Sequence, residues 1–161
     1  MSLDHWQDYA AAWGDPRMTA FIGGEPRSRN VSWGKMLQGI GMWSLFGYGY
    51  WSFVERESGS FVGNGGLAQF ERGIPELANI PEAGWAFTPD AWGKGYATEA
   101  MTAILEWADA QNLGETRCII DIGNAASHKV AHKLGYTKFA ESHDVIGDLF
   151  IYRREPRQSV R

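Results

Sequence analysis

Two short motifs in this chain combine glycines and polar residues in a pattern that suits an anionic ligand. In the first, Trp92–Ala100 (WGKGYATEA), a glycine turn opens directly into a segment with helical periodicity. Such a turn presents free backbone N–H groups at the positive end of a helix dipole, which is a common anion site. The second motif, Asn124–Ser127 (NAAS), places an Asn and a Ser at the start of another expected helix. In this order and spacing, the two motifs indicate a domain that binds a pyrophosphate-bearing cofactor.

The glycine turn does not match two familiar phosphate-binding loops. A Walker A loop requires Ser or Thr where this chain has Gly95, and Thr88 stands where its first Gly belongs. The dinucleotide-binding fingerprint fails as well, because Thr98 replaces its third Gly and the long run of alternating strands and helices is absent. A tight turn that binds no ligand stays open as an alternative.

A strand and a helix are expected to position the glycine turn. The strand covers residues 82–88 and leads into the turn, and the helix follows over 98–111. The helix carries an apolar stripe at i, i+3, i+4 and i+7, made of Met101, Ile104, Leu105 and Ala108. We expect Gly114 to end this helix.

A second strand and helix are expected to position the other motif. The strand is short and apolar and covers residues 116–122. The helix covers 125–134, with Asn124 as its N-cap and Gly135 as the residue that ends it.

The remaining segments are typical of a mixed α+β protein. Before the site, the sequence predicts helices over 4–13 and 28–45 and a β-hairpin over 48–70. After it, two strands over 136–141 and 145–153 close the fold. These elements together predict one sheet with helices packed on its faces.

Composition limits the class of protein. With 161 residues, 44% of them hydrophobic, the chain suits one domain with a substantial core. A net charge of −4 and a pI of about 5.5 argue against nucleic acid as a partner. The single cysteine, Cys118, excludes an internal disulfide, and its apolar neighbours favour a buried thiol over a nucleophile. With no signal peptide or long apolar run, we expect a cytoplasmic protein without a membrane segment.

The two motifs resemble those of the GNAT acetyltransferases. In that superfamily the pyrophosphate loop reads Arg/Gln-x-x-Gly-x-Gly/Ala, which corresponds here to WxxGxA at 92–97. The segments NxxS at 124–127 and KLGY at 133–136 resemble the branch that includes the ribosomal-protein N-terminal (Rim-type) acetyltransferases. Trp92 departs from the usual Arg or Gln of the loop.

The resemblance implies the GNAT fold over a single domain, residues 1–161. This is an α+β fold with a mixed, mainly antiparallel sheet and helices on both faces. Relatives begin with a strand before the first helix, whereas this chain begins in or just before that helix. We therefore expect the first edge strand to be missing.

The resemblance implies acetyl-CoA as the cofactor. Backbone N–H groups of the turn would bind its pyrophosphate, Lys94 and Lys129 would add positive charge, and Asn124 would contact the pantetheine arm. The residues expected to bind it are Phe87, Trp92, Gly93, Lys94, Gly95, Tyr96, Ala97, Thr98, Asn124 and Lys129. A solvated Lys94 and an Asn124 that serves only as a helix cap stay open.

Acetyl transfer to an amine, the reaction that the resemblance implies, needs a base and a donor to the developing oxyanion. Glu82 is the expected base, and backbone N–H groups near Phe87 are the expected oxyanion donors. Many relatives carry a Tyr general acid seven residues after the Asn, but here Ala131 stands there. Ser127 is then the candidate donor to the leaving sulfur. A Glu82 that is only an exposed strand-end carboxylate and a Ser127 that only starts a helix stay open.

The same helix carries two histidines with the spacing of metal ligands. His128 and His132 are four residues apart, but no third ligand is evident and no metal is expected.

The predicted function is the transfer of an acetyl group from acetyl-CoA to a primary amine, by direct attack in a ternary complex. The acceptor would be a protein N-terminus, an amino-acid-like compound or another small amine, and the acidic pI favours a cationic one. The protein would be a monomer or a homodimer. Two alternatives stay open: a non-catalytic acyl-CoA-binding module, and a nucleotide- or phosphate-binding protein unrelated to GNAT.

Overall fold

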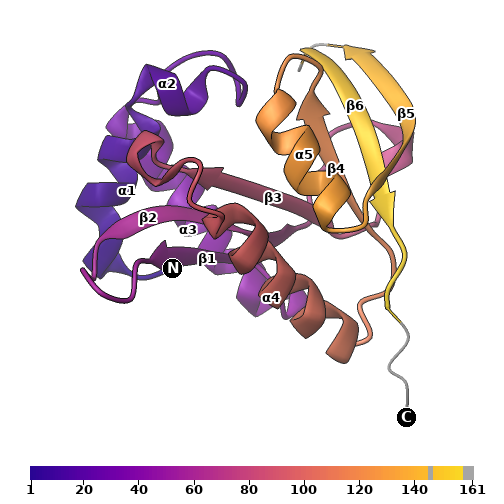
Figure 1. Ribbon diagram of the computed structural model, residues 1–161, viewed down its shortest axis with the longest axis horizontal. Coiled ribbons are helices and arrows are strands. Elements are labelled where there is room, and N and C mark those ends of the chain that lie inside the picture. The colour runs from indigo at the N-terminus through magenta and orange to yellow at the C-terminus, as the bar shows by residue number, and fades with distance from the viewer. Residues whose placement is uncertain (145–146, 158–161) are drawn as a thin grey trace.

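Figure 1 shows the computed structural model, which describes residues 1–144 and 147–157. These residues form a six-stranded sheet in the order β1-β2-β3-β4-β6-β5. The strands are β1 (Tyr50–Val54), β2 (Phe61–Ala68), β3 (Glu82–Phe87), β4 (Thr116–Asp121), β5 (Thr137–Asp144) and β6 (Gly147–Arg154). Neighbouring strands run antiparallel except β3 and β4, which run parallel. The predicted mixed, mainly antiparallel sheet is confirmed.

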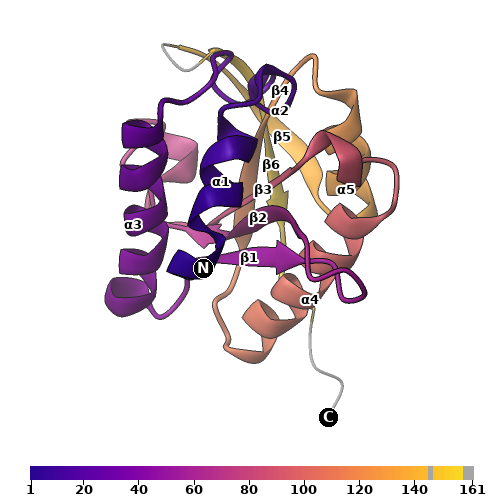
Figure 2. The ribbon, with the colours of Figure 1, turned by 90° about the vertical axis from the view of Figure 1, so that its left-hand side faces the viewer.

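Helices cover both faces of this sheet, as predicted (Figure 2). One face is covered by α1 and α3, and the other by α4 and α5. The α-helices are α1 (Trp6–Trp13), α2 (Pro16–Thr19), α3 (Arg29–Phe46), α4 (Tyr96–Ala110) and α5 (Ala125–Lys133). Three short 3₁₀ turns are described as well: η1 (Leu3–His5), η2 (Pro75–Leu77) and η3 (Pro89–Ala91).

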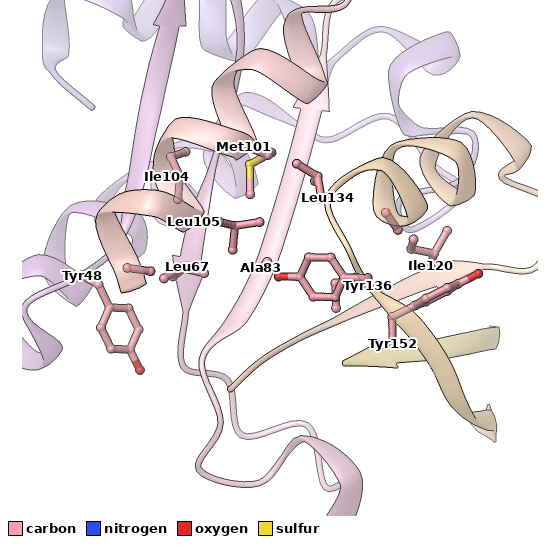
Figure 3. Packing of buried hydrophobic residues seen from close by; sticks show 13 residues of the cluster. Tyr48, Leu67, Ala83, Met101, Ile104, Leu105, Ile120, Leu134, Tyr136 and Tyr152 are labelled. Carbon is pink, nitrogen blue, oxygen red and sulfur yellow. The ribbon is translucent and has the colours of Figure 1, made fainter. Parts of the chain in front are cut away.

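The apolar stripe of α4 packs against the sheet in the largest hydrophobic cluster (Figure 3). None of the stripe residues is more than 6% exposed: Met101, Ile104, Leu105 and Ala108. They share this cluster with Leu67 of β2 and Ala83 of β3. Burial of each large apolar side chain contributes roughly 1.5–3 kcal/mol, which fixes α4 and therefore the glycine turn that precedes it.

The end of α4 corrects one prediction. Gly114 has a left-handed backbone (φ +79°), but the helix ends earlier, at Ala110. Asn112 takes the left-handed position after the helix (φ 58°), and the Leu113 N–H donates to Ala108 O (3.1 Å). Asn adopts this conformation more readily than most other non-glycine residues, and it therefore ends the helix where Gly was expected.

In the described residues no strand precedes α1, and β1 lies at an edge of the sheet, as predicted. Helix α3 runs beside this edge. Trp43 Nε1 of α3 donates to Tyr50 O of β1 (3.2 Å), so one backbone acceptor at the edge is satisfied within the protein.

The closing strands are confirmed as an antiparallel pair, β5 and β6. Residues 145 and 146, with which the predicted last strand begins, lie outside the described residues.

Candidate active site

The two parallel strands of the sheet separate soon after they begin (Figure 1). Strands β3 and β4 share one recorded pair of facing residues, Glu82 and Arg117, where the Arg117 N–H donates to Pro81 O (3.0 Å). No further pair between β3 and β4 is found in the described chain. The strands therefore splay toward their carboxyl ends, at Phe87 and Asp121, the region in which open α/β sheets bind ligands.

Because the strands separate, backbone groups of β3 that face β4 have no recorded pairing with it beyond Glu82 in the described residues. The Thr88 N–H donates to Val62 O across the β2–β3 ladder (2.9 Å). Successive residues of a strand direct their N–H groups to opposite sides, so the Phe87 N–H faces β4. A ligand amide lying along the splay could pair with β3 as an added strand does. This N–H is the predicted oxyanion donor, a role that stays a prediction.

Contacts of Phe87 fix the end of β3 and the start of the glycine turn. Its ring is buried and stacks on Phe53, with centroids 5.1 Å apart and planes at 12°. Its carbonyl oxygen accepts from Trp92 Nε1 (2.8 Å). Trp92, which stands where the family has Arg or Gln, therefore anchors the turn to the strand.

The start of α4 has no side-chain cap. Gly95 occupies the N-cap position with a left-handed φ of +86°, and Gly93 has a φ of +75°. The Glu99 N–H makes the first intrahelical bond, to Gly95 O (3.1 Å), so the N–H groups of Tyr96–Thr98 precede it. A Cβ at either glycine would meet no protein atom within 4 Å, so there is open space beside both glycines. This arrangement fits the pyrophosphate that the sequence motif predicts.

The start of α5 is capped by the side chain of its N-cap residue, Asn124. Asn124 Oδ1 accepts from the Ser127 N–H (3.1 Å), and the Asn124 N–H donates to Asp121 O (2.9 Å). The predicted cap is confirmed. Because Asn124 and Ser127 follow β4 and the glycine turn follows β3, both motifs lie at the carboxyl ends of the splayed pair.

The polar side chains near the two helix starts differ in their contacts with the rest of the protein. The Tyr96 hydroxyl donates to Glu55 of the β1–β2 hairpin, and this hydrogen bond raises the Tyr96 pKa. Lys94 Nζ lies 5.9 Å from the Tyr96 ring centroid. Lys129, one turn into α5, is exposed. The phosphate-binding roles of Lys94 and Lys129 remain predictions.

Glu82 lies at the amino end of β3, where β3 and β4 are still paired. It is 6% exposed, so the alternative of an exposed strand-end carboxylate is wrong. Its two carboxylate oxygens accept from Arg72 Nε and a terminal guanidinium nitrogen of Arg72, each at 2.7 Å. Each oxygen keeps lone pairs beyond these bonds, so the carboxylate can still accept from a ligand.

Tyr50 of β1 lies beside Glu82. Its hydroxyl oxygen would be 2.2 Å from a Cβ at Gly84, so the phenol lies directly over this glycine of β3. Burial, and then the charge of Glu82, raises the pKa of Tyr50, which keeps the hydroxyl protonated as a donor. Arg72 was not predicted as a site residue, since it belongs to no motif of the sequence.

The predicted site residues thus lie at two ends of the region in which β3 and β4 separate. The glycine turn, Asn124 and Ser127 lie at its open end, and Glu82 lies at its closed end. At about 3.3 Å per residue, Glu82 and Phe87 are separated by roughly 17 Å. Only a long ligand can contact both ends at once.

A cavity of about 510 Å³ lies on the α4 face of the sheet, between the β1–β2 hairpin and the start of α4. Phe53 and Phe87 line it, together with the carboxylate residues Glu55, Glu57 and Glu99. Glu82 is directed to the opposite face, because it alternates along β3 with Ala83, which packs under α4.

Of the two histidines of α5, His128 is hydrogen-bonded within the protein, and the His132 ring lies 5.7 Å from that of Tyr152. His128 Nδ1 bonds the Tyr152 hydroxyl (2.8 Å), and Nε2 lies 3.3 Å from Ile122 O. Within residues 1–144 and 147–157, no three His, Cys, Asp or Glu side chains are placed to hold a metal ion. None of the helices described there has the length and apolar character needed to cross a membrane.

Comparison with known proteins places the chain in a family. A family model described as "Acetyltransferase (GNAT) domain" matches residues 1–137. The chain is 33% identical over 91 residues to the uncharacterized protein YkkB of Bacillus subtilis, covering 56% of this chain and 51% of that protein. It is 25% identical over 140 residues to the uncharacterized N-acetyltransferase p20 of Bacillus licheniformis, covering 86% and 76%. The chain thus spans about half the length of the first relative.

Solved structures share the fold. A GNAT-family acetyltransferase of Bordetella pertussis superposes with a TM-score of 0.83 at 24% identity, over 95% of this chain and 91% of that one. A ribosomal-protein-S5-alanine acetyltransferase of Vibrio fischeri gives 0.76 at 18%, over 97% and 90%. A phosphinothricin acetyltransferase of Sinorhizobium meliloti, solved with AcCoA, gives 0.69 at 16%, over 92% and 84%. The chain belongs to the GNAT acetyltransferase family and has its fold.

Proposed function

We propose that this chain transfers an acetyl group from acetyl-CoA to a primary amine, which attacks directly within a ternary complex. Membership of the GNAT family supports this reaction. The observation that carries the proposal is the uncapped start of α4, which follows the splayed strand β3 and has open space beside Gly93 and Gly95. Acetyl-CoA would supply the acetyl group, activated as a thioester.

The two helix starts would hold the cofactor at the open end of the splay. The N–H groups of Gly93–Thr98 would donate to the pyrophosphate, and Asn124 would contact the pantetheine arm. Lys94 and Lys129 are close enough in sequence to these starts to add positive charge. The backbone of β3 up to Phe87 would orient the arm and place one N–H against the thioester oxygen.

Glu82 would take the proton of the attacking ammonium, directly or through a water molecule. Arg72 holds both carboxylate oxygens and so fixes their orientation toward the α1–α3 face. Free lone pairs on these oxygens suit a hydrogen bond from an amine.

Ser127 would donate a hydrogen bond to the departing thiolate. Its N–H is bound to the Asn124 side chain, and the residue is half-exposed at the start of α5. A thiol with a pKa of about 8.5 gives a fair leaving group. Catalysis is therefore chemically reasonable without the Tyr acid that many relatives carry at the position of Ala131.

Within the family, the NxxS and KLGY segments support a place near the Rim-type branch. At 18% identity, the likeness to the Vibrio fischeri enzyme concerns the fold alone.

A non-catalytic acyl-CoA-binding module is the second candidate. Two observations favour it: Ala131 stands where many relatives carry their Tyr acid, and Arg72 engages both oxygens of the only base proposed.

Substitution of Glu82 separates the two candidates. In an assay of coenzyme A release with a panel of amines, we expect the wild-type protein to turn over acetyl-CoA. Glu82→Gln should lower kcat by about a hundredfold or more and leave acetyl-CoA affinity nearly unchanged, because a base acts in the chemical step.

Asp109→Asn is the matched control. Asp109 also accepts two hydrogen bonds from a buried arginine, Arg154 (3.0 and 2.6 Å), but it lies at the far end of α4. Each variant leaves an arginine, half-buried Arg72 or buried Arg154, without its charged partner, so both should lose stability. If their kcat values fall alike, Glu82 is not the base. A wild-type protein that turns over no amine would favour the non-catalytic module.

A further inference from the structure

The side chain of Tyr50 crosses the sheet from β1 to β3. Tyr50 faces Gly66 of β2, and Gly66 faces Gly84 of β3, so the three residues form one row across three strands. Because neither glycine carries a side chain, the phenol can pass over β2 and reach β3. A Cβ at Gly84 would lie 2.2 Å from the Tyr50 hydroxyl oxygen and 3.3 Å from the ring carbon that bears it. The hydroxyl therefore lies over β3, although its residue belongs to the edge strand.

Helix α3 fixes the start of this side chain. A Cβ at Gly39 of α3 would lie 3.6 Å from the Tyr50 Cβ, so the helix packs over it. The Tyr50 carbonyl oxygen accepts from Trp43 Nε1 of the same helix (3.2 Å). A ring that is held at its base and passes over two glycines has a defined direction, and this direction places the hydroxyl.

The Tyr50 hydroxyl is available to a ligand. Tyr50 is half-buried, and no hydrogen bond of its hydroxyl is recorded in the described chain. Among the described residues, the buried side-chain polar atoms without a partner belong to His5, Ser32 and Ser52. The Tyr50 oxygen is not one of them, so solvent reaches it. A polar atom that the fold places but does not satisfy suits a contact with a substrate.

The hydroxyl lies between the proposed base and the N–H groups that face the thioester. Glu82 and Gly84 are two residues apart on β3, roughly 6.6 Å, and face the same side of the sheet. Because the Thr88 N–H faces β2, the N–H groups of Phe87 and Trp85 face β4. Even Trp85 is three residues from Glu82, roughly 10 Å along the strand. The Tyr50 hydroxyl, over Gly84, is nearer to both N–H groups than Glu82 is.

A general base must lie within about 3 Å of the proton that it takes, or one water molecule away. The Glu82 side chain covers only part of the distance to an amine that attacks a thioester at Trp85 or Phe87. A group with both a donor and an acceptor, placed between them, would cover the rest. A tyrosine hydroxyl has both.

Resting on the proposed function, we propose that Tyr50 relays the proton of the acceptor ammonium to Glu82. The ammonium donates to the phenol oxygen, and the phenol donates to a water molecule bound to the Glu82 carboxylate. The ammonium proton passes to the phenol oxygen, the phenol proton to the water, and a water proton to Glu82. The phenol and the water end as they began, and Glu82 ends protonated. The amine ends neutral, with the lone pair that forms the bond to the thioester carbon.

The surroundings of Tyr50 suit a relay rather than a base. Burial, and then the charge of Glu82, raises the pKa of the phenol, so it passes on a proton only as it receives another. The 6.6 Å between the backbone positions of Glu82 and Gly84 is a distance that two hydrogen bonds of about 2.8 Å through one water can span. Arg72 holds both oxygens of the carboxylate that receives the proton (2.7 Å each).

Gly84 allows a test in which stability and activity separate. In the described chain, and apart from its neighbours in sequence, a Cβ at Gly84 would meet only the Tyr50 phenol within 4 Å. Gly84→Ala should therefore displace the hydroxyl and lower both stability and kcat. Tyr50→Phe should lower kcat about tenfold or more, with stability and acetyl-CoA affinity nearly unchanged, because the ring remains. The double variant Tyr50→Phe/Gly84→Ala loses the 2.2 Å contact, so it should regain stability but not kcat.

Coupling to Glu82 is tested in the same assay. Both residues act on one proton, so Tyr50→Phe/Glu82→Gln should be no slower than Glu82→Gln alone. Tyr48→Phe is the matched control. It also removes a tyrosine hydroxyl, one that bonds the Gln69 side chain (3.0 Å), and it should leave kcat unchanged.

Coenzyme A release with the amine panel, acetyl-CoA titration and urea denaturation are measured for every variant. A wild-type protein that binds no acetyl-CoA or turns over no amine contradicts the proposed function, and the Tyr50 relay with it. Three results with an active wild type overturn the relay alone. They are full kcat in Tyr50→Phe, recovery of kcat together with stability in Tyr50→Phe/Gly84→Ala, and additive losses in Tyr50→Phe/Glu82→Gln.

Discussion

Helices α4 and α5 each follow one strand of the splayed pair and pack on the same face of the sheet, but their first turns are built differently. At α5, the Asn124 side chain accepts from a backbone N–H, so one free donor is satisfied within the protein. At α4, Gly95 offers no side chain, and the first N–H groups have no side-chain cap. The start of α5 thus satisfies a backbone donor within the protein, whereas the start of α4 has no side-chain cap, as the proposed cofactor site requires.

The difference follows from residue type. Asn at an N-cap stabilises a helix by about 1 kcal/mol relative to Ala. Gly at that position with a left-handed φ costs backbone entropy on folding but permits a close approach to the N–H groups. The uncapped start is tolerable because the buried stripe of α4 supplies the stability that its first turn lacks.

Substitution of Gly95 gives the largest expected effect. Gly95→Asp places a carboxylate and its bulk at the start of α4, in the open space beside Gly95. Repulsion of the pyrophosphate should weaken acetyl-CoA binding by about a hundredfold or more in calorimetric titration.

Gly114→Asp is the matched control for Gly95→Asp. Gly114 has a similar φ of +79° and equally open surroundings, but it lies beyond the end of α4. Both variants should lose on the order of 1 kcal/mol in stability from backbone strain. Equal losses of acetyl-CoA affinity in the two variants would show that the open helix start has no special role.

Substitution of Asn124 should have a smaller effect and separates capping from binding. Asn124→Ala should cost about 1 kcal/mol in unfolding free energy and lower acetyl-CoA affinity by roughly tenfold. Asn124→Asp keeps a capping oxygen, so stability should return while affinity stays low. Chemical denaturation and calorimetry measure the two quantities separately.

Ser28→Ala is the control for Asn124→Ala, because Ser28 caps α3 through the Val31 N–H (3.2 Å). Its stability loss should resemble that of Asn124→Ala, without a loss of affinity. Full acetyl-CoA affinity in Asn124→Ala would restrict this residue to a structural role.

Local sequence signals predicted the parts of the site that depend on short segments. The glycine turn, the α4 stripe and the Asn124 cap each lie within a few residues, and their positions are confirmed. Both Asn112 and Gly114 could end α4, and the prediction of Gly114 was wrong, because Asn112 takes the left-handed position after the helix. Helix α2 was missed, although Asp15 accepts from the Arg17 N–H (2.8 Å) and caps it.

Contacts between distant segments were not predictable from these signals. Glu82 was identified, but its burial and its pairing with Arg72 depend on how the loop after β2 folds back.

Calorimetric titration of the wild-type protein with acetyl-CoA, and separately with ATP and NAD, tests the central claim most directly. The open start of α4 and the splay of β3 and β4 predict binding of acetyl-CoA with a Kd on the order of micromolar to tens of micromolar, and no comparable binding of ATP or NAD. No heat with acetyl-CoA, or equal affinity for ATP, would contradict the claim that this helix start is an acyl-CoA site.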